Sequence, residues 1–176
     1  AVRTVKEARK FARDNHQART ALLESRMVSG SGALYANLLK SSGQQHWSRR
    51  ERIEFCTQKL DECAERRRAQ GDTAFCMEPE LKNGKGALRD VSTIFWLSMA
   101  WYGVPTAREL IGQGLVSEDE FNGFVRSRDF LWRVRSALHL ATGRETDKLR
   151  FDLQPELAAR FRYRDSERSS AVERFL

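Results

Sequence analysis

Residues 117–143 read SEDEFNGFVRSRDFLWRVRSALHLATG, a stretch that carries both the start and the stop signals of one long helix. Ser117 and Glu120 form the Ser-x-x-Glu pattern of a capping box, in which two side chains satisfy free N–H groups of the first turn. Gly143 is typical of the position just past a helix end. The apolar residues recur at helical steps, and we expect a buried stripe at Phe121, Phe124, Leu131, Val134 and Leu138. The stretch predicts an amphipathic helix that ends near residue 141.

Similar signals predict helices on the N-terminal side. Thr106 and Glu109 form a second capping box, which opens a short helix. Residues 87–102 are apolar nearly all round beyond the first turn, so we expect this helix at the centre of the core. Ser48 and Glu51 form a third box. The helix behind it, over 48–68, has an expected buried face of Ile53, Cys56, Leu60 and Cys63 and a solvated end at Arg66, Arg67 and Arg68.

The rest of the chain also favours helix. Residues 4–27 fit two helices or one bent helix, and 31–39, 155–161 and 165–176 fit shorter ones. Residues 72–85 contain proline and glycine and break the pattern. The fold class expected is all-α, an irregular multi-helix bundle of about eight helices with one extended Gly-rich loop segment.

Composition limits the possible functions. The chain has 176 residues, of which 40% are hydrophobic, enough for a real core. Lys and Arg total 31 against 24 Asp and Glu, a formal charge of +7. Such a charge favours an anionic partner, namely phosphate, nucleotide, nucleic acid or an acidic protein surface. A solvated basic surface without a ligand is the alternative that we favour on charge alone.

Cysteine usage and hydropathy indicate a cytoplasmic protein. The three cysteines have no metal-ligand or redox-pair spacing, so we expect reduced thiols. The longest apolar run, 94–102, is too short to cross a bilayer, and no signal peptide is evident. The first residue is not Met and the last segment still has helical spacing, so we expect a fragment cut at both ends.

The segment EPELKNGKGALRD, residues 78–90, is the best candidate site. Lys82 and Lys85 flank a Gly-rich turn that leads into a helix, where free backbone N–H groups and the positive dipole end favour a phosphate. Arg89 adds a planar donor in the first turn. A structural turn that caps the helix explains the same residues, and the spacing is not a Walker motif.

Several acidic and basic residues near this segment have two interpretations. Glu78 and Glu80 alternate in an extended stretch and could form a metal pair, but we favour neutralisation of neighbouring cations. Asp90 fits the helix dipole. On the long helix, Arg128, Arg135 and His139 share one face, and Arg126 and Arg133 a neighbouring one. A solvated face with local pairs such as Asp129 to Arg133 is favoured there over an anion-binding stripe.

Several long strings, in order, resemble one family. They are VRTVKEA at 2–8, TALLESRMVSG at 20–30, EPELKNGKGALRDV at 78–91, LWRVRSALHLATGRETDKLRFDLQ at 131–154 and AVERFL at 171–176. Together they resemble the bifunctional uridylyltransferase and uridylyl-removing enzymes of nitrogen control, GlnD, which modify the PII signal protein.

The resemblance implies a domain division. It makes residues 1–30 the C-terminal end of a nucleotidyltransferase domain and 31–176 a helical domain. The family usually has a second glycine where this chain has Ala87 and an asparagine where it has Glu80. Ala87 is acceptable at a helix start but not at a position that needs positive φ.

The activity that the resemblance implies is Mg²⁺-assisted transfer of UMP or AMP, from UTP or ATP, to a Tyr of PII. The metal-binding aspartates of that family lie upstream of this chain, so we assign no catalytic and no metal-binding residue here, and we expect the fragment alone to be inactive. We expect nucleotide or phosphate contacts at Lys82, Lys85 and Arg89, partner or phosphate contacts at Arg133, Arg135 and His139, and support behind them from Glu78 and Asp90.

Two other classes of function are the alternatives. A basic module that binds nucleic acid would need exposed aromatics among its cations, and Trp96, Trp101 and Trp132 instead sit in apolar helical patterns. A purely structural or docking domain would bind no nucleotide. The expected partners are therefore a nucleoside triphosphate, PII and the rest of the parent chain, with no membrane and no nucleic acid.

Overall fold

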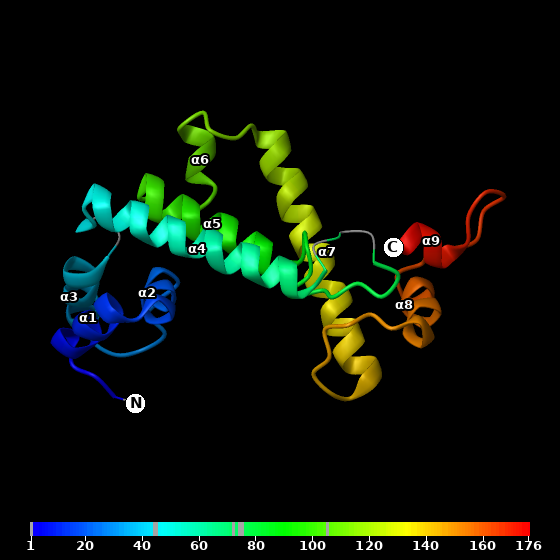
Figure 1. The fold of residues 1–176 in the computed structure, drawn as a ribbon, viewed down its shortest axis with the longest axis horizontal. Coiled ribbons are helices and arrows are strands. Elements are labelled where there is room, and N and C mark those ends of the chain that lie inside the picture. Colours follow the sequence, from blue (N-terminus) through cyan, green and yellow to red (C-terminus); the bar gives the residue numbers. More distant parts are fainter. Residues whose placement is uncertain (1, 44–45, 72, 74–75, 105) are drawn as a thin grey trace. The chain divides into compact units, whose positions relative to one another are not determined.

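The computed structural model describes residues 2–43, 46–71, 73, 76–104 and 106–176. Within these ranges the regular structure is helical, and an isolated antiparallel bridge joins Glu80 to Lys148. Figure 1 shows the helices, which are α1 Val5–Asp14, α2 His16–Leu23, α3 Gly32–Ser42, α4 Arg49–Ala69, α5 Leu88–Tyr102, α6 Glu109–Gly112, α7 Glu118–Thr142, η2 Phe151–Leu153, α8 Gln154–Arg160 and α9 Ala171–Phe175. The predicted all-α, multi-helix fold is confirmed.

The described helices divide into two compact units. Unit 1 contains Ala1–Cys63 and Thr93–Ser117, and unit 2 contains Ala64–Ser92 and Glu118–Leu176. The helices α4 and α5 thus supply residues to both units. The expected boundary at residue 30 concerns the parent protein's domains and stays a prediction.

Unit 1 packs around one aromatic core. Leu23, Phe55, Trp96 and Ala100 are its buried members, from α2, α4 and α5. Trp47 packs on Phe55 with their ring centroids 5.1 Å apart. The helices α1 and α2 are separate because Asn15 ends the first and caps the second, accepting a hydrogen bond from the N–H of Ala18. The broken version of the predicted N-terminal helix is therefore correct.

Unit 2 packs around α7. Its buried core residues come from the loop before α5, from α7, from the segment that follows α7 and from α8 and α9, namely Leu81, Val134, Ala137, Leu138, Leu149, Leu157, Ala158 and Phe175. Phe175 contacts the rings of Phe130, Phe161 and Tyr163 at centroid distances of 5.5 to 6.2 Å. The Gly-rich loop thus contributes a side chain, Leu81, to the core.

The predicted bounds of α7 are confirmed, while two other helices begin later than expected. Thr106 contacts Glu109 through its side chain, but α6 begins at Glu109 and has no side-chain cap bond at Arg108. The C-terminal helix α9 covers Ala171–Phe175, because Ser170 and Glu173 form the capping box at that point. The residues between 165 and 170 form a turn instead.

The buried face of α4 is only partly the predicted one, since Cys63 is buried as expected but two other members are not. Ile53 and Leu60 are 45% and 55% exposed, whereas Phe55, Lys59 and Cys63 are buried. Lys59 is buried because its ammonium lies 4.9 Å from the Trp96 ring centroid and 2.6 Å from the Glu62 carboxylate. A buried face predicted from the spacing of apolar residues alone could not include this lysine.

Two exposure expectations for tryptophan were also wrong. Trp101 and Trp132 are 45% and 49% exposed, and only Trp96 of the three is buried. Trp132 lies beside a cation, with the Arg135 guanidinium 5.5 Å from its ring. In the described part of the chain, no helix combines the length and the apolar character that a membrane crossing requires.

Candidate functional site

The 78–90 segment forms a tight turn that its own side chains hold. The Glu80 carboxylate accepts hydrogen bonds from the backbone N–H groups of Lys82 and Asn83. The Gly84 N–H donates to the carbonyl of Glu80, 3.2 Å away. A β-carbon at Gly84 would lie only 2.5 Å from that carbonyl oxygen, so the turn requires glycine at this position.

The departure from the family pattern at Ala87 does not strain the backbone. Gly86 has φ +79°, a conformation that favours glycine, and Ala87 is not among the positive-φ residues. Ala87 directly precedes α5 and is buried. The position that needs positive φ is therefore Gly86, which the chain retains.

Asp90 joins this turn to the C-terminal end of α4. Its carboxylate accepts hydrogen bonds from Arg66 at 2.6 Å, from Arg67 at 2.8 Å and from the backbone N–H of Gly86 at 2.9 Å. Burial alone would raise the pKa of Asp90, but these bonds outweigh it and hold the pKa below its usual value. Arg66 and Arg67 therefore bind a buried carboxylate instead of ending a solvated helix, which corrects the prediction.

A short antiparallel pairing connects the turn to the segment after α7. The Leu81 N–H donates to the Asp147 carbonyl at 2.7 Å, and the Leu149 N–H donates to the Pro79 carbonyl at 2.9 Å. Gln154, which is 2% exposed, closes this pairing by donating to the carbonyls of Met77 and Leu149. The turn is thus fixed through backbone bonds on one side and through Asp90 on the other.

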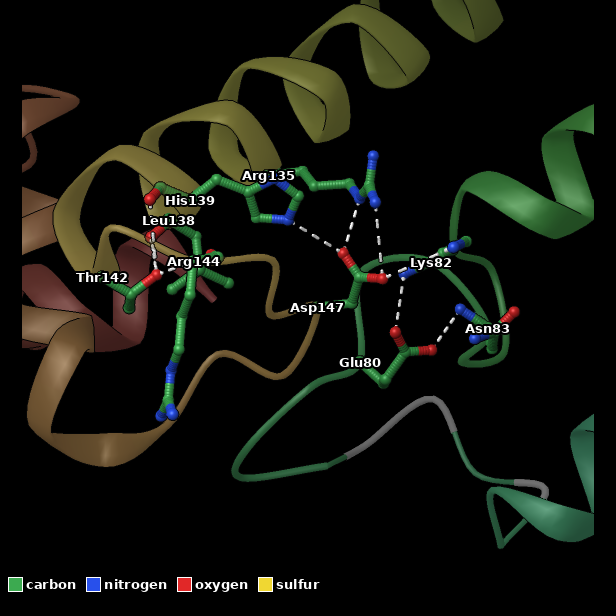
Figure 2. Close-up of polar contacts among 9 residues, drawn as sticks. All are labelled: Glu80, Lys82, Asn83, Arg135, Leu138, His139, Thr142, Arg144 and Asp147. Atoms are coloured by element: carbon green, nitrogen blue, oxygen red, sulfur yellow. Dashed lines mark hydrogen bonds and ion pairs between the residues drawn. The ribbon is translucent and has the colours of Figure 1, made fainter.

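Asp147 lies where the turn meets α7, and Figure 2 shows three basic side chains pointing toward its carboxylate. Arg135 donates from Nε at 2.6 Å, His139 Nε2 lies at 3.2 Å and Lys82 Nζ at 3.8 Å. Burial raises the pKa of Asp147. The bonds from Arg135 and His139 and the nearby charges lower it by more, so the pKa lies below its usual value. The carboxylate is therefore charged at neutral pH and holds this group together.

The structure brings together some of the predicted site residues and separates others. Lys82, Arg135 and His139 meet at Asp147, whereas their sequence patterns predict two separate groups. Arg133 does not join them, because its guanidinium lies 5.3 Å from the Phe161 ring. Asp129 pairs with Arg128 at 2.9 Å, and the predicted pair with Arg133 is wrong.

The three predicted phosphate contacts, Lys82, Lys85 and Arg89, are all at least partly exposed. Lys85 is exposed and Arg89 half-buried, on the turn and in the first turn of α5. Lys82 is 40% exposed and is the loosest of the three cations at Asp147. An anion that approached this side would meet the ammonium groups of Lys82 and Lys85 on a fixed backbone, an arrangement that suits a phosphate.

The carboxylates present do not fit a Mg²⁺ ion. Glu78 binds Lys148 at 2.9 Å and accepts a bond from the Phe151 N–H, while Glu80 is turned onto its own loop. Glu78 and Glu80, the possible metal pair, therefore each make a separate structural contact and do not form one metal site. The described residues contain no group of three or more His, Cys, Asp or Glu side chains that could hold a metal ion.

Sequence reasoning missed Asp147 and Gln154. Both lie within the string 131–154 that carried part of the family resemblance, and that was the only signal for them. By composition, Asp147 is one acid among several after Gly143. Its importance comes from a backbone pairing across 66 residues, between Leu81 and Asp147, which no local pattern encodes.

Comparisons with known proteins place these observations in a family context. A family model described as GlnD PII-uridylyltransferase matches residues 54–176. The chain is 42% identical over 174 residues to a bifunctional uridylyltransferase/uridylyl-removing enzyme of Cereibacter sphaeroides, covering 99% of this chain. It is 42% identical over its full length to the enzyme of that name from Nitrobacter hamburgensis, and 40% identical to the one from Rhodospirillum rubrum.

The matched region is a small part of those relatives. This chain spans 19% of the length of each. No solved structure matches the chain.

Proposed function

This chain belongs to the GlnD PII-uridylyltransferase family, and we propose from this that it is the helical part of an enzyme that transfers UMP from UTP to a Tyr of the PII signal protein. The observation that carries the proposal is the overlap between the matched residues 54–176 and the cation-bearing turn at Asp147. Transfer of AMP from ATP uses the same chemistry and remains the closest variant of this proposal. The parent enzyme would act in the cytoplasm.

The turn at residues 78–86 supplies positive charge on a fixed backbone. Phosphoryl and nucleotidyl transfer depend on positioning and on charge stabilisation, because the transition state spreads negative charge over phosphate oxygens. Lys82, Lys85 and Arg89 would contact the triphosphate or an acidic surface of PII. Arg135, His139 and Asp90 hold the turn in place. Arg133, on the neighbouring face of α7, would be a further partner contact.

The metal ion that such transfer uses would be held elsewhere in the parent protein. Around the turn, Asp90, Asp147 and Glu78 are already paired with Arg66, Arg135 and Lys148, so no step of the reaction is assigned to them. This chain alone would therefore bind and position without catalysing the transfer.

The test is steady-state kinetics of UMP transfer by the full-length enzyme that carries Lys82→Ala and Arg89→Ala. The account predicts a fall in kcat/KM for UTP or for PII of about 100-fold, since each lost charge-assisted hydrogen bond costs about tenfold. Arg168→Ala removes one positive charge at an exposed position away from the turn and should leave kcat/KM within about twofold.

Unchanged kinetics in the double variant would refute the proposed contacts. A fall in kcat/KM for PII alone would assign the turn to the protein substrate, and a fall for UTP alone would assign it to the nucleotide.

A further inference from the structure

A small basic pocket lies in unit 1, among residues of α1, α2, α3 and the start of α4. Its volume is about 90 Å³, enough for several water molecules and thus of the size of one phosphate group. Three arginines line it, and so do a histidine, a tryptophan and a glutamate, namely Arg9, Arg13, Arg19, His46, Trp47 and Glu51. The arginines alone bring three positive charges against one carboxylate.

Arg19 is fixed at the wall of this pocket. Its Nε and Nη2 donate to the carbonyls of Ala12 and Arg13, at 3.4 and 3.1 Å, at the end of α1. Its guanidinium lies 5.5 Å from the Trp47 ring. The remaining nitrogen, Nη1, is buried and has no hydrogen-bond partner among the residues that the structure describes. A buried charged donor without a partner is costly, and a bound anion would satisfy it.

The guanidinium groups of the other two arginines, Arg9 and Arg13, make no contact that stabilises the fold in the described part of the chain. Arg9 and Arg13 are exposed side chains of α1, and in the described part of the chain no hydrogen bond or ion pair holds their guanidinium groups. Each carries up to five donors in a planar fork that suits a tetrahedral oxyanion. They are therefore free to close over a ligand that Arg19 anchors.

The single carboxylate of the pocket does not neutralise this charge. Glu51 accepts hydrogen bonds from the N–H and the hydroxyl of Ser48, both at 2.7 Å, as part of the cap of α4. Those bonds, chiefly the backbone one, and then the charges of Arg19 and Arg13 hold the pKa of Glu51 below its usual value. Glu51 is thus a charged cap residue near the arginines, and the pocket keeps a positive excess.

We infer that this pocket is a phosphate-binding site, in which Arg19 anchors the phosphate group of a small molecule and Arg9 and Arg13 close over it. The inference does not rest on the proposed function, because the pocket lies in unit 1 and shares no residue with the turn at 78–90. Inorganic phosphate and a nucleotide offer the same recognised group. The experiment separates these two sources.

The test is isothermal titration calorimetry of the 176-residue chain at constant ionic strength, with inorganic phosphate, pyrophosphate, UTP and uridine as probes. The expected result is one site for the phosphate-bearing probes and none for uridine. Tighter binding of UTP than of pyrophosphate would mean that the pocket binds a nucleotide. Equal binding would mean that the pocket recognises the phosphate group alone.

Variants locate the site. Arg9→Gln with Arg13→Gln should weaken phosphate binding about 100-fold, or tenfold for each lost charged hydrogen bond, and should leave the helix content unchanged. Arg50→Gln removes an exposed arginine of α4 that does not line the pocket and should change affinity by less than about twofold. Arg19→Lys keeps the charge but loses the fork, and should weaken binding even if Arg19→Ala fails to fold.

Binding of none of the three phosphate-bearing probes would overturn the inference. So would affinity that the Arg9→Gln, Arg13→Gln variant leaves unchanged, or uridine binding as tightly as UTP.

Discussion

Arg135 Nε donates to the Asp147 carboxylate at 2.6 Å and thereby ties the middle of α7 to the segment that pairs with the Gly-rich turn. The same carboxylate draws in His139 and Lys82. Asp147 thus links α7, the segment that follows α7 and Lys82 of the turn.

Asp147→Asn should destabilise the chain by about 1 to 3 kcal/mol, because it leaves the half-buried Arg135 without its charged acceptor. The measurement is the free energy of unfolding in urea. Asp129→Asn is the matched control on α7, since Asp129 also contacts an arginine but is 57% exposed, and it should cost less than about 1 kcal/mol. Equal losses in both variants would show that Asp147 is an ordinary surface acid.

Gly84→Ala should destabilise the turn by about 1 to 3 kcal/mol, since the new methyl group would meet the Glu80 carbonyl oxygen at 2.5 Å. Gly32→Ala is the control, because a β-carbon there meets nothing within 4 Å at the start of α3. Thermal unfolding of the two variants should shift Tm downward for Gly84→Ala and not for Gly32→Ala. Equal Tm values would contradict the close approach at Gly84.

His16 should make the stability of the chain depend on pH in the mildly acidic range. Burial first, and then the charges of Lys59 and Arg19, lower the pKa of His16 from 6.5, although Glu62 and Glu54 oppose them. The unfolded chain then binds the proton more readily than the folded chain does. Stability is therefore full above about pH 6.5 and falls as the pH drops toward the lowered pKa of the folded state.

Urea unfolding at pH 7.5 and at pH 5 measures this dependence. His16→Gln should flatten the slope between the two values, because the amide does not titrate. If the free energy of unfolding of the His16→Gln variant still depends on pH as in the unsubstituted chain, other groups cause the dependence.

The sequence predicted the helices well where their signals are local. The capping boxes at Ser48 and Ser117 precede helices that begin at Arg49 and Glu118. Buried faces were harder to predict, because the core of unit 1 includes Lys59, whose ammonium is held by Trp96 and Glu62. Hydropathy alone assigns such a residue to the surface.

The candidate site was predicted only in part, for a similar reason. Lys82 was identified from its local context, in a Gly-rich turn before a helix. Its meeting with Arg135 and His139 depends on Asp147, and Asp147 reaches the turn through bonds from the backbone of Leu81. Long-range pairing of this kind has no periodic signature in the sequence. The solvated end expected for Arg66 and Arg67 was wrong for the same reason, since their acceptor, Asp90, lies in another helix.

The role of the turn in the parent enzyme can be measured directly by comparing kcat/KM for UMP transfer to PII between Asp147→Asn and Asp129→Asn full-length enzymes, at a temperature where both are folded. If Asp147 positions the cations of the turn, Asp147→Asn should lose about tenfold or more, since small displacements of charged groups are costly in such reactions, and Asp129→Asn should stay within about twofold. If the Asp147→Asn enzyme keeps the kcat/KM of the unsubstituted enzyme, the claim that Asp147 positions the cations of the turn is wrong.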